Sequence, residues 1–209
     1  YLRFFIARLQ GDPSRRRLLS QKVLTTSLGG SSVDLIEVNE PVDDQAAEPH
    51  GRDGSPDSPK LDANGRAETS LKSSAPKSFR RLQRQRQRLP IVVVARQHPG
   101  EPQGSWMAHG LLEFLTDPQD PCARELRQRF SFHVVPMLNT DGTILGNSRC
   151  CVAGLDTNRH WSAPSVAQVP EVHAMKDYIA KLPLGCYMVL DLHGHSTKNG
   201  IFFYGCRYN

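Results

Sequence analysis

The sequence has no long hydrophobic run and no recognisable membrane-targeting segment. It contains no stretch of about 18 consecutive apolar residues, which a membrane-spanning helix needs. The apolar run at Tyr1–Phe5 is too short for a signal peptide, and a basic stretch follows at residues 15–17. The chain also lacks an initial methionine, so we expect it to begin inside a longer protein.

Cysteine is scarce, and its spacing shows no pairing. The five cysteines are odd in number and include no Cys-x-x-Cys pair: Cys122, Cys150, Cys151, Cys186 and Cys206. This pattern argues for reduced thiols, and hence for an intracellular, cytoplasmic protein. It also argues against a structural zinc site built from cysteines.

Hydrophobic residues make up only 38% of the chain, below the roughly 45–50% of a typical globular domain. The deficit is concentrated in residues 41–88, which are rich in Pro, Asp, Ser, Gly, Lys and Arg. Such a segment cannot bury enough apolar surface to offset its ordering entropy, so we predict a disordered basic and polar insertion there. Its basic run at 77–88 favours a solvated linker over a nucleic-acid-binding or localisation patch, despite the net charge of +5. We expect neither a nucleic-acid nor a membrane partner.

On both sides of the insertion, the periodicity of apolar residues predicts helices alternating with strands. Residues 1–40 should hold a helix over 1–9 and a β-hairpin over 23–38. Residues 89–209 should hold the helices 105–115, 122–129 and 170–181 and the strands 91–95, 130–135, 184–190 and 201–204. This alternation predicts an α/β fold with a mixed, largely parallel sheet flanked by helices. In such sheets, functional sites gather at the carboxyl ends of strands.

Two of these helices have a recognisable apolar stripe. In the first helix the stripe consists of Leu2, Phe5, Ile6 and Leu9. In the helix 105–115 it consists of Trp106, Leu111, Leu112 and Leu115. We expect both stripes to face the core.

Two predicted strands end in residues that can bind a metal ion. The strand 91–95 is followed by His98-Pro99-Gly100-Glu101, which presents an imidazole and a carboxylate from one tight turn. The strand 184–190 is followed by His193 and His195, of which His193 is favoured because it lies nearer the strand end. Two histidines and one glutamate can bind a catalytic zinc whose fourth position holds water. For His98 alone, the competing interpretation is a histidine buried in the core at a strand end.

Five motifs in a fixed order carry a resemblance to a known family. They are His-Pro-Gly-Glu at 98–101, Pro-Met-Leu-Asn-x-Asp-Gly at 136–142, Gly-Asn-x-Arg at 146–149, Gly-x-Asp-x-Asn-Arg-x-Trp at 154–161 and Asp-Leu-His-Gly-His-Ser at 191–196. In these motifs the sequence resembles the cytosolic carboxypeptidases, an intracellular branch of the zinc carboxypeptidases related to carboxypeptidase A. The resemblance covers residues 89–209 and extends more weakly to the hairpin 23–38. It departs from the family at Thr140, where Pro is usual, and at Thr157, where Leu is usual.

The resemblance implies a role for each matching residue. His98, Glu101 and His193 would bind one Zn²⁺ per chain, and Asp156 would accept a hydrogen bond from the first histidine ligand. Arg149 would stabilise the tetrahedral oxyanion. The terminal carboxylate of the substrate would be bound by Asn158 and Arg159. The implied protein is a zinc metallocarboxypeptidase that removes C-terminal residues from intracellular proteins, with glutamate-rich tails such as those of tubulin as substrates.

The resemblance also implies a general-base glutamate well beyond the last zinc ligand. The segment Gly194–Asn209 contains neither Asp nor Glu. We therefore expect this sequence to be the N-terminal part of a catalytic domain, incomplete on its C-terminal side, and the 209-residue chain alone to be inactive. One alternative is a non-catalytic module that binds zinc and carboxylates, and another is a scaffold with a basic linker and incidental metal binding.

Some candidate residues also have plainer interpretations. Turn capping would explain Asp156 and Asn158, and a surface ion pair would explain Arg159. For Asp191 the sequence leaves two interpretations open, an exposed strand-end residue or a residue that supports a metal ligand. The remaining polar candidates are interpreted as turn formers (Asn139 and Asp141) or as helix-surface and helix N-terminal charges (Glu113, Glu125 and Glu171).

Overall fold

The computed structural model describes residues 1–41 and 87–205 of the chain. The predicted disordered insertion, residues 41–88, lies almost entirely outside the described residues and stays a prediction. Among the described residues, none of the helices combines the length and the apolar character that crossing a membrane requires.

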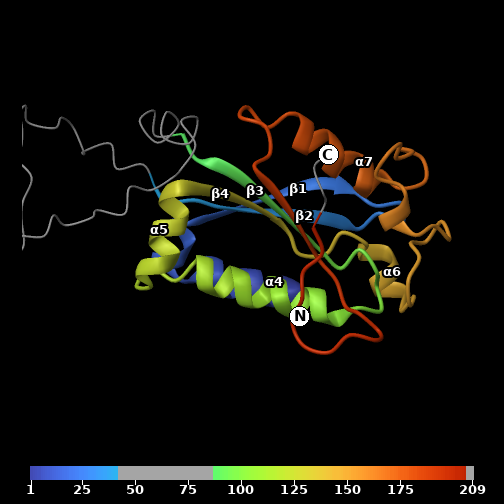
Figure 1. The fold of residues 1–209 in the computed structure, drawn as a ribbon, viewed down its shortest axis with the longest axis horizontal. Helices are drawn as coiled ribbons and strands as arrows, with labels where there is room; N and C mark the ends of the chain where they lie inside the picture. The colour runs from blue at the N-terminus through green and yellow to red at the C-terminus, as the bar shows by residue number, and fades with distance from the viewer. Residues whose placement is uncertain (42–86, 206–209) are drawn as a thin grey trace, which may run out of the picture. The chain divides into compact units, whose positions relative to one another are not determined.

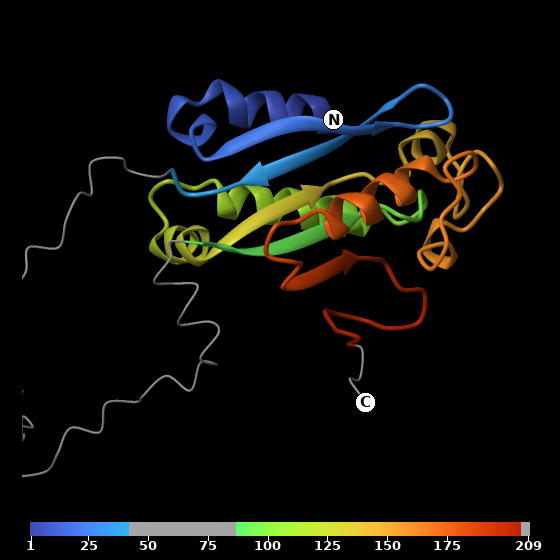
Figure 2. The same ribbon diagram turned by 90° about the horizontal axis from the view of Figure 1, so that it is seen from above.

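The described residues form a mixed sheet, as the sequence predicted, and this sheet has five strands (Figure 1). The strands are β1 (Leu19–Thr26), β2 (Ser32–Val38), β3 (Leu89–Ala95), β4 (Phe130–Val135) and β5 (Met188–Leu192). Their order across the sheet is β1-β2-β4-β3-β5, which Figure 2 shows from above. The β1–β2 and β2–β4 pairs are antiparallel, whereas β4–β3 and β3–β5 are parallel. The parallel part of the sheet therefore contains both strands that precede the predicted metal ligands.

Helices cover both faces of the sheet (Figure 1). They are α1 (Leu2–Gly11), α2 (Pro13–Arg16), α4 (Pro102–Leu115), α5 (Pro121–Arg129), α6 (Thr140–Leu145) and α7 (Pro170–Ala180), with a 3-10 turn, η1, at Thr157–Arg159. Four of these helices have proline at their first position, where the missing N–H costs no hydrogen bond. The N-terminus of α5 is also capped by the Asp120 side chain.

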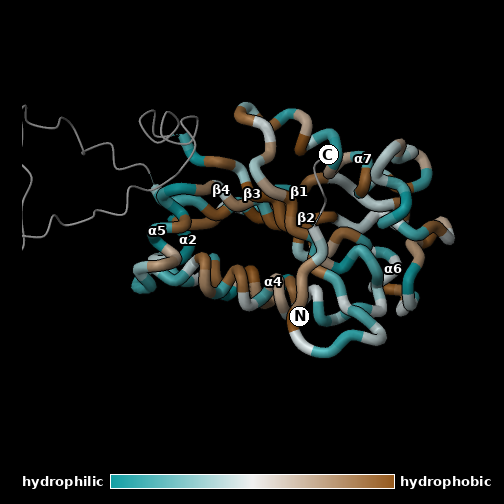
Figure 3. The backbone as a smooth tube through the Cα atoms, in the orientation of Figure 1, coloured by the Kyte–Doolittle hydropathy of each residue, from teal (hydrophilic) through white to brown (hydrophobic). Residues whose placement is uncertain are grey.

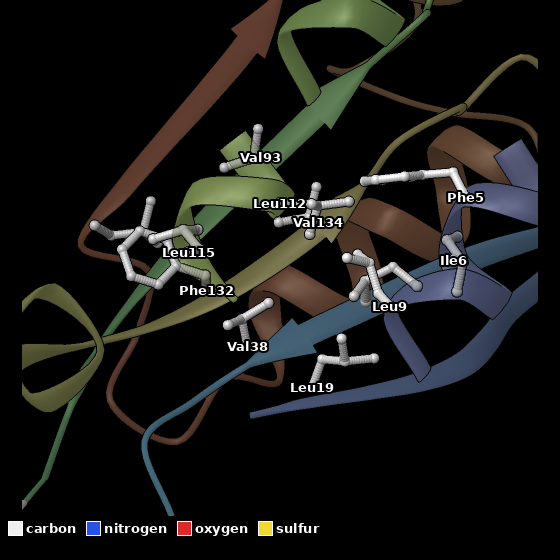
Figure 4. Close-up of a cluster of buried hydrophobic side chains, with 12 residues drawn as sticks. Phe5, Ile6, Leu9, Leu19, Val38, Val93, Leu112, Leu115, Phe132 and Val134 are labelled. Atoms are coloured by element: carbon white, nitrogen blue, oxygen red, sulfur yellow. The ribbon is translucent and has the colours of Figure 1, made fainter. Parts of the chain in front are cut away.

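The core consists of two apolar clusters, one on each face of the sheet. Along β3, Ile91 and Val93 join the cluster under α1 and α4, whereas Val92 and Val94 join the cluster under α7. This division follows from the alternation of side chains along a strand. Figure 4 shows the first cluster, and Figure 3 shows the hydrophobic residues gathered along the central strands.

Helix α4 begins earlier than predicted, and one residue of its predicted apolar stripe does not face the sheet, whereas Leu111, Leu112 and Leu115 pack into the core as expected. It starts at Pro102 rather than at residue 105, and Trp106 is 59% exposed, so its predicted place in the apolar stripe is wrong. Gly104, Ala108 and Leu112 are spaced four residues apart, so they lie on the same face of the helix, and all three are buried. The small residues Gly104 and Ala108 let the start of α4 pack closely against the sheet.

Three predictions about the remaining segments need correction. The predicted strand 184–190 forms at 188–192 instead, because Pro183 and the left-handed Gly185 (φ 68°) hold the earlier residues in a turn. Residues 201–204 are described but take no strand conformation. The predicted turn at residues 139–142 is the start of α6, where the Asn139 side chain accepts a hydrogen bond from the Gly142 N–H.

Replacement of Leu112 by alanine tests the packing of α4 on the sheet. Leu112 is fully buried, so Leu112→Ala should lower the free energy of unfolding by about 2–5 kcal/mol. Urea-induced unfolding followed by circular dichroism measures this loss. Met107→Ala on the same helix is the control, because Met107 is 40% exposed; an equal loss in both variants would contradict this packing.

Candidate metal centre

His98 and Glu101 lie in a tight turn between the end of β3 and the start of α4. Arg96 begins the turn in the left-handed region (φ 56°), and its guanidinium Nε donates to the Pro99 carbonyl at 2.7 Å. The Glu101 N–H donates to the His98 carbonyl at 3.1 Å. At Gly100 the backbone N–H donates to the Ser148 carbonyl, and a Cβ there would lie only 2.5 Å from that oxygen. The turn therefore holds both side chains in a fixed relation and requires glycine at position 100.

His193 reaches the same place from β5. Because β3 and β5 run parallel in register, with Ala95 opposite Leu192, their carboxyl ends lie at the same edge of the sheet. The Glu101 carboxylate lies between the two imidazoles, with Oε1 at 2.9 Å from His98 Nδ1 and Oε2 at 3.0 Å from His193 Nδ1. One ligand atom from each of these three residues lies within 4.8 Å of the others. The structure thus brings together the three residues that the sequence predicted as metal ligands.

The outer nitrogen of each imidazole meets an aspartate. His98 Nε2 lies 3.0 Å from Asp156 Oδ1, and His193 Nε2 lies 2.6 Å from Asp191 Oδ2. A carboxylate only accepts hydrogen bonds, so each aspartate favours a proton on Nε2. Each Nδ1 faces the Glu101 carboxylate and donates a hydrogen bond to it in this structure. A bound metal would take the place of that proton on Nδ1, whereas Nε2 would keep its proton and its aspartate partner.

The charges of the site suit a cation. Burial alone would raise the pKa of Glu101, but hydrogen bonds from the Gly194 N–H, His193 and His98 outweigh burial and lower it. Burial is likewise outweighed at Asp156, whose pKa is lowered by His98, the Asn158 N–H and Arg149. The hydrogen bond to Asp191 raises the pKa of His193 against the effect of burial. Anionic carboxylates therefore surround the two imidazoles.

The donor set fits zinc. Two imidazole nitrogens and one carboxylate are a common set of protein ligands for a catalytic zinc, and they leave a position for water. The ring orientation also fits, because each histidine has a carboxylate partner on the nitrogen that faces away from Glu101. Residues 98, 101 and 193 are the residues that would hold the ion.

Of the other predicted site residues, two contact this cluster or its aspartates, and two are exposed to solvent without a contact to it among the described residues. Arg149 binds the Asp156 carboxylate, with its Nη2 2.7 Å and its Nε 2.9 Å from Oδ2. The Asn158 side-chain nitrogen lies 3.3 Å from His193 Nε2. Arg159 is exposed, and its guanidinium donates a hydrogen bond to the Asn158 carbonyl at 3.4 Å. His195, the rival ligand, is also exposed and accepts a hydrogen bond from the Thr197 N–H, away from the cluster.

Two other polar residues are buried, which the sequence interpretation did not predict. Glu171 lies in the first turn of α7, as expected of a helix N-terminal charge, but it is only 3% exposed, and burial raises its pKa. Gln97 was not identified from the sequence, yet it is 1% exposed and contacts Asp191. Its position directly before His98 is the signal that could have identified it.

Comparisons with known proteins identify the family of this chain. The family described as zinc carboxypeptidase matches residues 14–206. Cytosolic carboxypeptidase 2 of Danio rerio is 42% identical over 207 residues, which cover 98% of this chain and 23% of that protein. Cytosolic carboxypeptidase 4 of Homo sapiens is 43% identical over 128 residues, which cover 60% of this chain and 11% of that protein. The chain thus spans less than a quarter of the length of these relatives.

The solved structures agree with the fold. A metallo-carboxypeptidase from Burkholderia cenocepacia superimposes with a TM-score of 0.65 at 29% sequence identity, over 93% of this chain and 40% of that chain. A putative carboxypeptidase A from Shewanella denitrificans gives the same TM-score at 25% identity, over 93% of this chain and 39% of that chain.

Two glycines on α4 form a matched test of the packing that positions the ligands. A Cβ on Gly104 would lie 2.5 Å from the Leu192 carbonyl, whereas a Cβ on Gly110 would meet nothing within 4 Å. Gly104→Ala should therefore push α4 away from β5, weaken metal binding and cost about 1–3 kcal/mol of stability. Gly110→Ala should leave metal binding unchanged and stabilise the chain by about 0.5–1 kcal/mol. Zinc titration and urea unfolding measure both effects, and unchanged zinc binding in Gly104→Ala would contradict the close approach.

Proposed function

Because this chain belongs to the zinc carboxypeptidase family, in its cytosolic carboxypeptidase branch, we propose that it forms the metal-binding part of a metallocarboxypeptidase. The observation that carries the proposal is the convergence of His98, Glu101 and His193 within 4.8 Å. The enzyme removes residues from the C-termini of proteins, and each chain holds one zinc ion.

Each of the site residues has a separate role in the proposed reaction. When bound, zinc would act as a Lewis acid: it would polarise the scissile carbonyl and lower the pKa of a water molecule bound to the ion. His98, Glu101 and His193 hold the ion, and Asp156 fixes the orientation of the His98 ring through the 3.0 Å contact. Arg149 lies beside Asp156, where its guanidinium can stabilise negative charge that develops on the substrate oxygen.

The terminal carboxylate of the substrate is bound by Asn158 and Arg159. A guanidinium suits this task because it offers two parallel N–H groups to a carboxylate. Both residues belong to the segment that carries Asp156, and the Asn158 side chain lies 3.3 Å from His193 Nε2. Arg159 is exposed and hence open to a peptide that approaches from solvent.

The proposed substrates are acidic protein tails inside the cell, with the removal of glutamates from tubulin-like C-termini as the specific activity. The exposed guanidinium groups of Arg149 and Arg159 support an anionic substrate, and the net charge of +5 agrees with it. The relatives of this chain are named cytosolic carboxypeptidases. Five cysteines without paired spacing support the same compartment.

Replacement of Arg159 by lysine tests the proposed activity, in the native protein that carries this chain. Lysine keeps the charge but loses the two-pronged contact, so kcat/KM for a glutamate-ended peptide should fall by about 10–100-fold. Peptides with a free and with an amidated C-terminus are compared in the wild type and the variant. The wild type should hydrolyse only the free form, and the variant should lose most of that preference.

The control is Arg129→Lys, because Arg129 is exposed on α5 and pairs with Glu125 on the same helix. Its kcat/KM should match that of the wild type. An Arg159→Lys variant that discriminates between the two peptides as well as the wild type would contradict the assignment of Arg159. Zinc and peptide binding without any hydrolysis by the wild type would favour the alternative, a non-catalytic binding module.

A further inference from the structure

The second histidine of the metal centre has a carboxylate partner of its own. Asp191 and His193 are two residues apart at the end of β5, so their side chains project from the same face. His193 Nε2 lies 2.6 Å from Asp191 Oδ2, a shorter contact than the 3.0 Å between His98 Nε2 and Asp156. The family resemblance assigned a supporting carboxylate only to His98.

Gln97, in the turn that follows the neighbouring strand β3, donates a hydrogen bond to this carboxylate. Its side-chain Nε2 donates to Asp191 Oδ2 at 2.5 Å, and its Oε1 accepts from the Trp161 indole N–H at 2.8 Å. The indole can only donate and the carboxylate can only accept, so the chemistry of the two partners fixes the direction of the amide. With 1% exposure, Gln97 has little access to water as an alternative partner.

The backbone of Gln97 is held as firmly as its side chain. Its carbonyl accepts hydrogen bonds from Asn139 Nδ2 at 3.1 Å and from Thr157 Oγ1 at 3.0 Å. Gln97 therefore joins the end of β3 to the cap of α6, to the 3-10 turn η1 and, through Asp191, to the end of β5. Such an arrangement leaves the amide little freedom to turn away from the carboxylate.

We propose that Asp191 and Gln97 are positioning residues of the metal centre: Asp191 orients the His193 imidazole, and Gln97 orients Asp191. The inference rests on the proposed function, because it assumes that His193 is a zinc ligand. Asp191 fixes the proton on Nε2 and leaves the Nδ1 lone pair for the metal. The unit Trp161–Gln97–Asp191–His193 thus parallels the unit Arg149–Asp156–His98 on the other side of Glu101.

The two units differ in charge. Arg149 forms an ion pair with Asp156 and neutralises part of its charge. Gln97 is neutral, so it donates a hydrogen bond to Asp191 without forming an ion pair with it. We expect the loss of either aspartate to weaken metal binding, because each one holds a histidine of the metal centre.

Metal binding by the 209-residue chain tests this inference without any assay of activity. Zinc affinity is measured by competition with a chromogenic chelator, and the visible absorption of bound Co²⁺ reports the geometry of the ligands. Asp191→Ala should lower the zinc affinity by about 10–100-fold and change the Co²⁺ spectrum. Asp191→Asn should recover part of the affinity, because its amide oxygen can still accept from His193.

Gln97→Met removes both side-chain hydrogen bonds at a similar volume and should weaken zinc binding by about tenfold or less. If Gln97 acts through Asp191, the double variant Gln97→Met/Asp191→Ala should bind zinc no more weakly than Asp191→Ala alone. If the fold losses of zinc affinity in the two single variants multiply in the double variant, Gln97 does not act through Asp191, and the proposal is wrong on this point.

Thr116→Val is the control for a purely structural loss. Thr116 is fully buried at the far end of α4 and donates to the Leu112 carbonyl at 2.7 Å. The variant should lower the stability of the chain but leave zinc affinity and the Co²⁺ spectrum unchanged. Asp191 and Gln97 variants that behave like Thr116→Val, while His193→Ala loses the metal, would overturn this inference and leave the metal centre intact. A wild-type chain that binds no metal would contradict both this inference and the proposed function.

Discussion

The parallel pairing of β3 with β5 is the constraint on which the metal centre depends. The register that sets Ala95 opposite Leu192 brings two chain segments almost a hundred residues apart to the same edge of the sheet. The turn after β3 then supplies His98 and Glu101, and the residue after β5 supplies His193. Gly104 completes the arrangement, because the absence of a Cβ lets α4 approach the Leu192 carbonyl. A shift of β5 by one residue would turn His193 to the other face of the sheet.

The polar groups at this edge satisfy one another. Burial disfavours the charged forms of Glu101 and Asp156, yet hydrogen bonds that these carboxylates accept from histidines and backbone N–H groups hold the pKa of both below the usual value. Each imidazole meets Glu101 on one side and an aspartate on the other. Such a network fixes ring orientation before a metal binds, so less reorganisation is needed when the ion arrives.

The sequence predicted those parts of the structure that depend on local pattern. Strand 130–135 formed with the expected bounds, because two phenylalanines and two valines favour a strand there. Strand 184–190 was placed too early, because an apolar run does not reveal that Gly185 adopts a left-handed turn. Convergence of the three ligands followed from strand ends and from family resemblance. For Asp191 the sequence left support of a metal ligand as one of two interpretations, and the structure shows its contact with His193. The partners of Gln97 could not be derived from local pattern, because they depend on the β3–β5 register and on an indole from a distant segment.

The central claim is that His98, Glu101 and His193 hold one zinc ion. X-ray absorption spectroscopy at the zinc edge tests this claim most directly. For the 209-residue chain loaded with one equivalent of zinc, the account predicts a first shell of nitrogen and oxygen atoms only, at about 2.0–2.1 Å. It also predicts outer-shell scattering from two imidazoles, reduced to one in His193→Ala. A sulfur shell at about 2.3 Å, or a spectrum unchanged in both His98→Ala and His193→Ala, would contradict the claim.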